Sequence, residues 1–211
     1  MGASSAEHLN HRLTRPDYSG STVRLARRLL GCFLCHRVDG QVLRGRIVET
    51  EAYTQDAASH AAGGRRTPRN QVMFGTPGLL YVYFTYGMHH CVNVVAEQEG
   101  VAGAVLIRGL DHIARAQGPG LVARALRLTR RDNGRDLATD PDVWIEPGFR
   151  KRSERIVTTT RIGVRLAAEL PLRFYLLGSP GVSKRDRDAE LRLLARTLAK
   201  RHVATTNSHR G

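Results

Sequence analysis

Apolar and polar residues alternate along much of this chain, often with a period of two. Such alternation is typical of β-strands, because successive side chains of a strand point to opposite faces. Short apolar runs between turn residues are typical of strands that are buried on both faces. The pattern predicts strands over residues 32–38, 41–53, 79–86, 89–96, 101–110, 161–164 and 172–177. Turns at Asp39-Gly40 and Gly87-Met88 make hairpins of the first two pairs.

A helical period is present in shorter stretches. Apolar residues recur every three or four positions between Ser21 and Gly31, where serine suits the start of a helix and glycine suits its end. A second helix is predicted over residues 121–128, after the Gly-Pro-Gly sequence that begins at residue 118. A terminal helix with charged faces is predicted over residues 186–201.

The length of 211 residues suits one domain that can bury a substantial core. The chain contains no internal repeat and no boundary that would divide the core. We assign residues 21–201 to a single domain, and residues 1–20 and 202–211 to flexible tails. The segment 54–77 is irregular, and so long an irregular loop inside a domain is usually functional or disordered.

The strand over residues 41–53 carries an unusual combination of side chains. Glu49, Glu51 and Tyr53 share one face, although a face of so long a strand is expected to be buried. Residues 57–96 contain no Asp or Glu. They contain Arg65, Arg66, Arg69, His60, His89, His90, Tyr81, Tyr83 and Tyr86. A carboxylate that faces such a segment suggests catalysis on an anionic substrate. The alternative is that both glutamates are solvated and paired with arginines.

Several other residues leave two interpretations open. Arg108 is the one charged residue in the apolar strand 101–110, and burying an unpaired charge is costly. It either forms a structural salt bridge, or holds Glu51 or a substrate anion. The arginines of the segment 65–69 either bind phosphates or belong to a solvated loop. Tyr86 lies at a hairpin tip, where a large aromatic side chain has little core to pack against.

The net charge of +14 indicates an acidic polymer as partner, because neutralising phosphates releases counterions. A membrane surface would also attract this charge, but the chain lacks an apolar run near the roughly 18 residues that a spanning helix needs. Residues 1–20 lack the apolar region of a secretory signal. Three cysteines cannot all pair within the chain, so we expect a reducing cytoplasm.

Cys32, Cys35 and His36 have the spacing of a c-type haem attachment site. That attachment requires export, for which there is no signal. On a strand, positions three apart point to opposite faces, which separates the two sulfurs and argues against zinc as well. We expect buried structural cysteines, no metal and no other cofactor.

In this order, the elements are similar to those of the alkyladenine (3-methyladenine) DNA glycosylase family. The resemblance runs from about Leu25 to Ser183. Its landmarks are LRGRIVETEAY at 43–53, His60, TPRN at 67–70, MF at 73–74, PG at 77–78, LYVY at 80–83, YGM at 86–88, CVN at 91–93, GPG at 118–120, RIGV at 161–164, LRFY at 172–175 and GSP at 178–180. So many landmarks in order make chance a poor explanation.

The resemblance implies an α+β domain with a curved, largely antiparallel β-sheet, flanking helices and a β-hairpin that protrudes into the minor groove of DNA. It implies that Glu51 is the general base that activates water, and that Arg108 and the backbone carbonyl of Ile162 help to hold that water. Tyr86 would be the wedge inserted where the flipped base had been, with Met88 beside it.

The resemblance also implies a pocket for the flipped base, lined by Tyr53, His60 and Tyr83. Asn93 would lie on its floor and disfavour the exocyclic amine of normal guanine.

A lyase reaction would need an amine nucleophile. The lysines of the chain all lie outside the tyrosine-rich half, so simple hydrolysis is favoured.

The implied function is that of a monofunctional DNA glycosylase. It would flip alkylated or deaminated purines, such as 3-methyladenine and hypoxanthine, out of duplex DNA and hydrolyse the N-glycosidic bond, which starts base excision repair. We expect a monomer that works at the bacterial nucleoid, or in the nucleus of a eukaryotic cell. The alternative is a non-catalytic nucleic-acid-binding protein, for which the charge and a wedge-like hairpin would also serve. That alternative gives no reason for Glu51 or Arg108.

Overall fold

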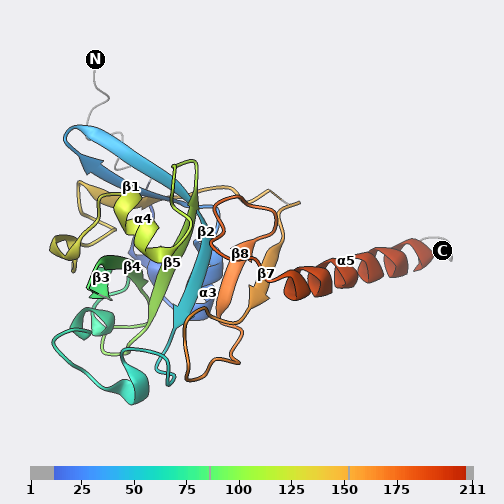
Figure 1. Ribbon diagram of the computed structural model, residues 1–211, viewed down its shortest axis with the longest axis horizontal. Coiled ribbons are helices and arrows are strands. Elements are labelled where there is room, and N and C mark those ends of the chain that lie inside the picture. Colours follow the sequence, from blue (N-terminus) through green and yellow to red (C-terminus); the bar gives the residue numbers. More distant parts are fainter. Residues whose placement is uncertain (1–11, 86, 152, 208–211) are drawn as a thin grey trace.

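An eight-stranded sheet forms the centre of the computed structural model, which describes residues 12–85, 87–151 and 153–207. Its strands are β1 Phe33–Val38, β2 Gln41–Tyr53, β3 Leu80–Thr85, β4 His89–Val95, β5 Ala104–Asp111, β6 Val143–Glu146, β7 Ile156–Thr159 and β8 Arg173–Leu176. The helices are α2 Arg15–Tyr18, α3 Thr22–Arg28, α4 Pro119–Ala125 and α5 Arg187–Asn207, with short 3-10 turns at Ala62–Gly64, Gln71–Phe74 and Arg130–Asp132. The sheet is curved, and α5 extends away from it (Figure 1).

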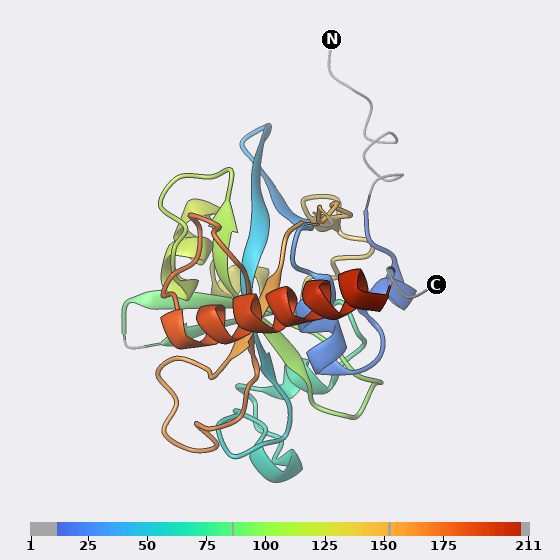
Figure 2. The same cartoon turned by 90° about the vertical axis from the view of Figure 1, so that its right-hand side faces the viewer.

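All strand pairings are antiparallel, in the order β3-β4-β5-β2-β1-β6, and β8 joins β2 to β7. The expected α+β fold with a curved antiparallel sheet is confirmed. The β3–β4 hairpin projects from one side of the molecule (Figure 2). Its insertion into DNA stays a prediction, and Tyr86 at its tip lies outside the described residues.

β2 is the strand on which the sheet depends. β5 pairs along β2 from Arg46 to Tyr53, while β1 and β8 pair with earlier and later parts of it. The register between β2 and β5 shifts on both sides of Glu49, and within this ladder Val48 and Arg108 have no paired Cα. Such a bulge re-aims the side chain of the extra residue. Here it affects the one arginine of an otherwise apolar strand segment.

The main core lies on the face of the sheet that α3 covers (Figure 1). Leu25 and Ala26 of α3 pack with Val48 and Ala52 of β2 in one buried cluster. The hydroxyl of Thr50, on the same face, donates to the carbonyl of Ala26 at 2.8 Å. The glutamates of β2 therefore point to the opposite face, as the strand period predicts.

The folded part begins before residue 21. Residues 12–20, which we had assigned to a flexible tail, include α2 and bury Leu13 and Tyr18 in the main core. Gly78 has φ +90°, and a Cβ there would lie 2.6 Å from the Tyr18 ring. Glycine at residue 78 therefore allows the tyrosine to pack, and residues 12–20 are an integral layer of the domain. At the other end, α5 runs to Asn207.

The strand predicted over residues 161–164 is wrong. β7 ends at Thr159, and residues 160–164 form an irregular loop. Arg161 is the reason, because its buried guanidinium binds Asp56 at 2.7 and 3.0 Å rather than lying beside a strand. Gly163, at φ +77°, also turns the chain out of the extended conformation.

The cysteines behave as structural residues. Cys32 and Cys35 are buried, and burial raises the pKa of both thiols. His36 is hydrogen-bonded through Nδ1 to the carbonyl of Leu126 at 2.7 Å. In the described part of the chain, no cluster of three or more metal-binding side chains occurs, and no helix is both long and apolar enough to cross a bilayer.

Candidate active site

A pocket of about 310 Å³ opens on the face of the sheet opposite α3. Its lining comes from alternate positions of neighbouring strands, since residues two apart share a face. β3 contributes Tyr81 and Tyr83, and β4 contributes Cys91 and Asn93. The lining residues are Tyr53, Ala58, His60, Met73, Tyr81, Tyr83, Thr85, Cys91, Asn93, Ala104, Leu106, Arg108, Pro119, Ile162, Gly163 and Val164.

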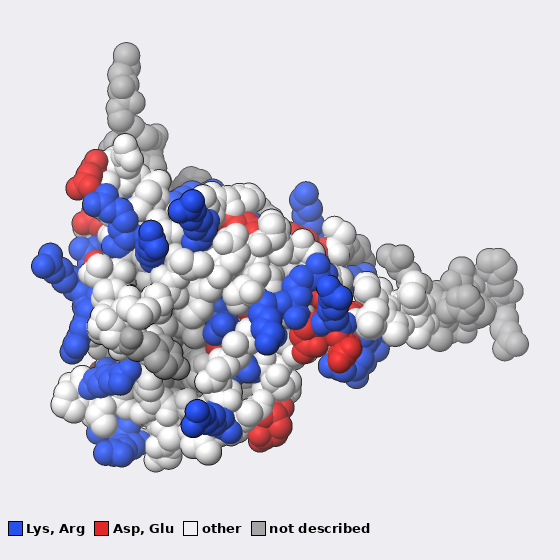
Figure 3. Space-filling view, in the orientation of Figure 1, with Lys and Arg blue, Asp and Glu red and all other residues white. Residues whose placement is uncertain are grey.

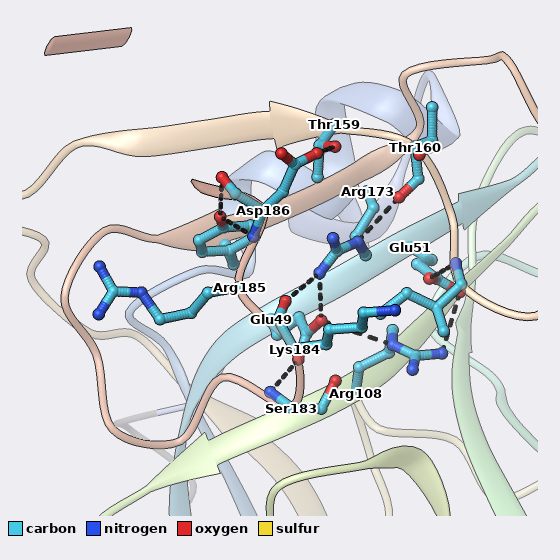
Figure 4. Close-up of polar contacts among 12 residues, drawn as sticks. Glu49, Glu51, Arg108, Thr159, Thr160, Arg173, Ser183, Lys184, Arg185 and Asp186 are labelled. Carbon is cyan, nitrogen blue, oxygen red and sulfur yellow. Dashed lines mark hydrogen bonds and ion pairs between the residues drawn. The ribbon is translucent and has the colours of Figure 1, made fainter. Parts of the chain in front are cut away.

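Glu51 is completely buried in the wall of this pocket. Its Oε2 accepts a hydrogen bond from the Tyr53 hydroxyl at 2.8 Å, and Arg108 Nη1 lies 3.4 Å from the same oxygen. Its Oε1 accepts from the backbone N–H of Ile162 at 2.8 Å. All three partners line the pocket, so the carboxylate lies directly behind them. Figure 4 shows the side chains of Glu51 and Arg108 close to one another.

The pKa of Glu51 is raised above that of an ordinary glutamate. Burial is the largest cause, because it disfavours the charged form. Arg108, the N–H of Ile162 and the Tyr53 hydroxyl oppose the rise, while the charge of Glu49 adds to it. A carboxylate with increased proton affinity beside a pocket is suited to general-base chemistry.

Glu49 is also completely buried but has different partners (Figure 4). Its Oε1 accepts from Arg173 Nη1 at 2.9 Å, and its Oε2 accepts from the N–H of Ser183 at 2.7 Å. Arg108 Nε lies 3.6 Å from Oε1. In the alternative interpretation, solvation is wrong for both glutamates, but their pairing with arginines is confirmed. Arg108 contacts both carboxylates.

An aromatic cluster of His60, Tyr81 and Tyr83 forms part of the pocket lining. His60 Nδ1 lies 2.9 Å from the Tyr81 hydroxyl, and its ring meets the Tyr83 ring edge-on at a centroid distance of 4.6 Å. Partial burial and then the charge of Arg69 lower the pKa of His60, so its ring is neutral at pH 7. Burial raises the pKa of Tyr81 to about 12. The cluster therefore offers neutral, flat surfaces to a ligand. Tyr81 belongs to a buried cluster with Met73 and Phe74 and also lines the pocket.

Asn93 is buried on the β4 side of the pocket, where its side-chain amide donates to the carbonyls of Tyr81 at 3.0 Å and Cys91 at 3.4 Å. These bonds fix its orientation. Met88, on the turn of the hairpin, is 70% exposed and does not belong to the pocket lining. The structure thus brings the residues of the predicted pocket together and leaves Met88 outside it.

The basic loop near the pocket is held by aromatic rings. Arg65, Arg66 and Arg69 are exposed. The Arg66 guanidinium lies 4.4 Å from the centre of the Phe74 ring, and that of Arg69 lies 5.5 Å from the centre of Tyr83. Basic side chains are spread over the face shown in Figure 3, where acidic ones are fewer.

One buried arginine of the site was not predicted from the sequence. Arg161 binds Asp56 and donates to the carbonyl of Ala52 at 3.1 Å, and it lies 4.8 Å from the centre of the Tyr53 ring. It thereby fixes the loop that brings the N–H of Ile162 to Glu51. The arginine of the RIGV sequence was visible, but its carboxylate partner lies 105 residues away.

The pocket combines a buried carboxylate with aromatic side chains, and the chain is strongly basic. These features suit a hydrolase that acts on planar groups attached to an anionic polymer. Residues 16–180 match the model of the methylpurine-DNA glycosylase (MPG) family. The chain therefore belongs to the MPG family of DNA glycosylases, enzymes of base excision repair that hydrolyse N-glycosyl bonds. This confirms the resemblance found in the sequence.

Individual relatives agree with the family match. The chain is 40% identical to the DNA-3-methyladenine glycosylase of Mus musculus, over 89% of this chain and 66% of the mouse protein. It is 42% identical to a candidate 3-methyladenine DNA glycosylase of Carboxydothermus hydrogenoformans, over 82% of this chain and 99% of that protein. It is 44% identical to a protein of the same description from Methanoculleus marisnigri, over 80% of this chain and 96% of that protein.

Proposed function

We propose that the protein is a monofunctional glycosylase that flips alkylated or deaminated purines, such as 3-methyladenine and hypoxanthine, out of duplex DNA and hydrolyses their N-glycosidic bond. The observation that carries this proposal is the burial of Glu51 behind the pocket, with hydrogen bonds from Tyr53 and Ile162 and contact with Arg108. The family match favours this function over a non-catalytic nucleic-acid binder.

In the proposed reaction, Glu51 takes a proton from a water molecule that attacks the anomeric carbon of the sugar. The transition state has oxocarbenium character, which a nearby carboxylate stabilises. A positioned general base contributes about 10²–10⁴-fold. Arg108 holds Glu51 on one side and faces the pocket on the other, so it also orients the water. The carbonyl of Ile162 is the second proposed contact of that water.

The remaining rate enhancement comes from the leaving group and from base capture. An alkylated purine is already cationic and leaves readily, whereas neutral hypoxanthine requires protonation. Extruding a base costs a few kcal/mol, and stacking on an aromatic ring recovers about 1–3 kcal/mol per base. Tyr53, Tyr83 and His60 supply these surfaces, and Asn93 restricts the pocket floor. Tyr86 and Met88 are the proposed wedge that slows return of the base.

The proposal is tested by incubating the protein with duplexes that contain deoxyinosine or 3-methyladenine and measuring alkali-labile abasic sites. Glu51→Gln should abolish excision and leave the Kd for lesion DNA nearly unchanged. Glu154→Gln is the matched control, because Glu154 pairs with Arg46 away from the pocket. Retained turnover in Glu51→Gln would sink the assignment. Binding without abasic sites in the unmodified protein would support the non-catalytic alternative.

A further inference from the structure

Behind Glu51 lies a buried ion pair for which the proposed reaction has no use. Glu49 is 0% exposed and Arg173 is 3% exposed, and neither is among the described residues that line the pocket. Their carboxylate and guanidinium are 2.9 Å apart. Desolvation offsets most of the attraction in a buried pair, so such a pair is a weak source of stability. Its contacts indicate another role.

The first contact of the pair is with Arg108, which links Glu49 to Glu51. Arg108 Nε faces Glu49 at 3.6 Å, and its Nη1 faces Glu51 at 3.4 Å. Nε has no hydrogen-bond partner among the described residues. Because the bulge removes Arg108 from the regular ladder, its direction depends on these two carboxylates. Figure 4 shows the guanidinium between them.

The second contact leads through the backbone. Arg173 Nε donates to the carbonyl of Thr160 at 2.8 Å, and its Nη1 also donates to the carbonyl of Lys184 at 2.7 Å. Thr160 stands two residues before Ile162, whose N–H binds Glu51. Arg173 thus contacts Glu49 and, at the same time, the loop that presents a hydrogen-bond donor to Glu51.

We propose that Glu49 and Arg173 are positioning residues, which fix Glu51 through Arg108 on one side and through the Thr160–Ile162 backbone on the other. This inference rests on the proposed role of Glu51 as general base. The four side chains alternate in charge, with two carboxylates and two guanidiniums. A neutral residue at position 49 would leave Arg108 with Glu51 as its one remaining carboxylate among the described residues. It would also remove a negative charge close to Glu51, which would lower the proton affinity of Glu51 and misdirect Arg108.

The pH dependence of excision distinguishes the two roles, because it would stay unchanged if Glu49 and Arg173 were merely structural. The titratable and charged neighbours of Glu51 are Tyr53 and Glu49 of β2, Arg108 of β5, Cys91 of β4 and its cross-strand partner Arg173 of β8. Burial raises the pKa of both Tyr53 and Cys91, so neither loses its proton on the acid side of neutrality. His60 also titrates on the acid side, because burial lowers its pKa, but its contacts are with Tyr81 and Tyr83. A shift of the acid limb of excision in a variant at position 49 would therefore report on Glu51.

The test is single-turnover excision by Glu49→Gln from pH 4 to 8, with binding of lesion DNA measured in parallel. We expect a loss on the order of 10²-fold in rate, as for other small misplacements of catalytic groups. We also expect an acid limb at lower pH than in the unmodified protein and an unchanged Kd. Glu154→Gln should change none of these quantities, because Glu154 pairs with Arg46, and in the described part of the chain no hydrogen bond or ion pair joins Arg46 to Glu51 or Arg108.

A second variant separates positioning from folding. Glu49→Gln leaves Arg173 buried without its counter-charge and should lower Tm. Glu49→Gln combined with Arg173→Gln removes both charges, so it should recover part of the Tm and none of the rate. Recovery of rate together with Tm would make the pair structural and overturn the inference.

The two proposals fail in different ways. If Glu51→Gln retains turnover, the proposed general base is wrong, whatever residue 49 does. If Glu51→Gln is inactive while Glu49→Gln keeps the rate and the acid limb of the unmodified protein, the positioning role alone is wrong.

Discussion

Glu49 and Glu51 project from the same face of β2 and are both completely buried, yet their carboxylates have different surroundings. Glu51 is bonded to groups that line the pocket, whereas Glu49 is bonded to Arg173 and the backbone of Ser183. The guanidinium of Arg108 lies between the two. Under the two proposals, Glu51 takes part in the chemistry and Glu49 positions the groups that surround it.

Glu51 is expected to reduce stability at neutral pH. Its pKa is raised in the folded state, so folding favours the protonated form. This contribution of Glu51 to the free energy of unfolding is fully present below the unfolded pKa of about 4.3 and is lost as the pH rises through the folded pKa. The loss amounts to about 1.4 kcal/mol for each pH unit by which the folded pKa exceeds the unfolded one. Glu51→Gln should therefore unfold at higher denaturant concentration than the unmodified protein at pH 8, with a smaller difference at pH 4. Equal differences at both pH values would contradict the raised pKa.

If Glu51 is the general base, as proposed, the acid limb of excision follows from the same carboxyl group. Glu51 can accept a proton from water only when it is ionised, and burial raises its pKa. The single-turnover rate should rise tenfold per pH unit below a midpoint that lies above the ordinary glutamate value of about 4.3. A midpoint at or below that value would show that its partners outweigh burial.

The loop arginines are expected to bind DNA phosphates. Arg65, Arg66 and Arg69 are exposed near the pocket, and aromatic rings support two of them. Each change to alanine should reduce the slope of log K against log salt by about 0.9 for each phosphate that the arginine neutralises. Arg192→Ala is the matched control, because Arg192 is exposed on α5, which extends away from the sheet (Figure 1). Unchanged slopes would show that these arginines contact solvent and no DNA phosphate.

Gly109→Ala tests the packing behind the carboxylates. A Cβ at this position would lie 2.2 Å from the carbonyl oxygen of Gly181 and 3.2 Å from the Cβ of Glu49. The segment from Gly181 would have to move, and with it the N–H of Ser183 that binds Glu49. We expect a loss of about 1–3 kcal/mol in the free energy of unfolding, as for other overpacked sites. Unchanged denaturation would mean that this segment relaxes freely.

Local rules predicted the elements whose signals are contiguous in the chain. The Asp39-Gly40 turn joins β1 and β2 as expected, and β3 and β4 pair as the second predicted hairpin, on either side of Gly87-Met88. β6 (Val143–Glu146) and β7 (Ile156–Thr159) were not predicted, and each of these short strands is defined by its pairing with a distant strand, β1 or β8. The segment from Arg161 failed as a strand for the opposite reason. Its alternation was strand-like, but a buried ion pair with Asp56 decided its conformation.

The sequence by itself determined which side chains share a face of β2, because the strand period is a property of the backbone. It also determined the acid-free segment that faces them and the excess of positive charge. It could not separate the environments of Glu49 and Glu51. The partners that distinguish them are distant in the chain, because Ile162 lies 111 residues from Glu51 and Arg173 lies 124 residues from Glu49. Burial then makes those contacts decisive, since water no longer screens or replaces them. The family resemblance named Glu51 as the base, but only the tertiary structure showed how the surroundings of the two carboxylates differ.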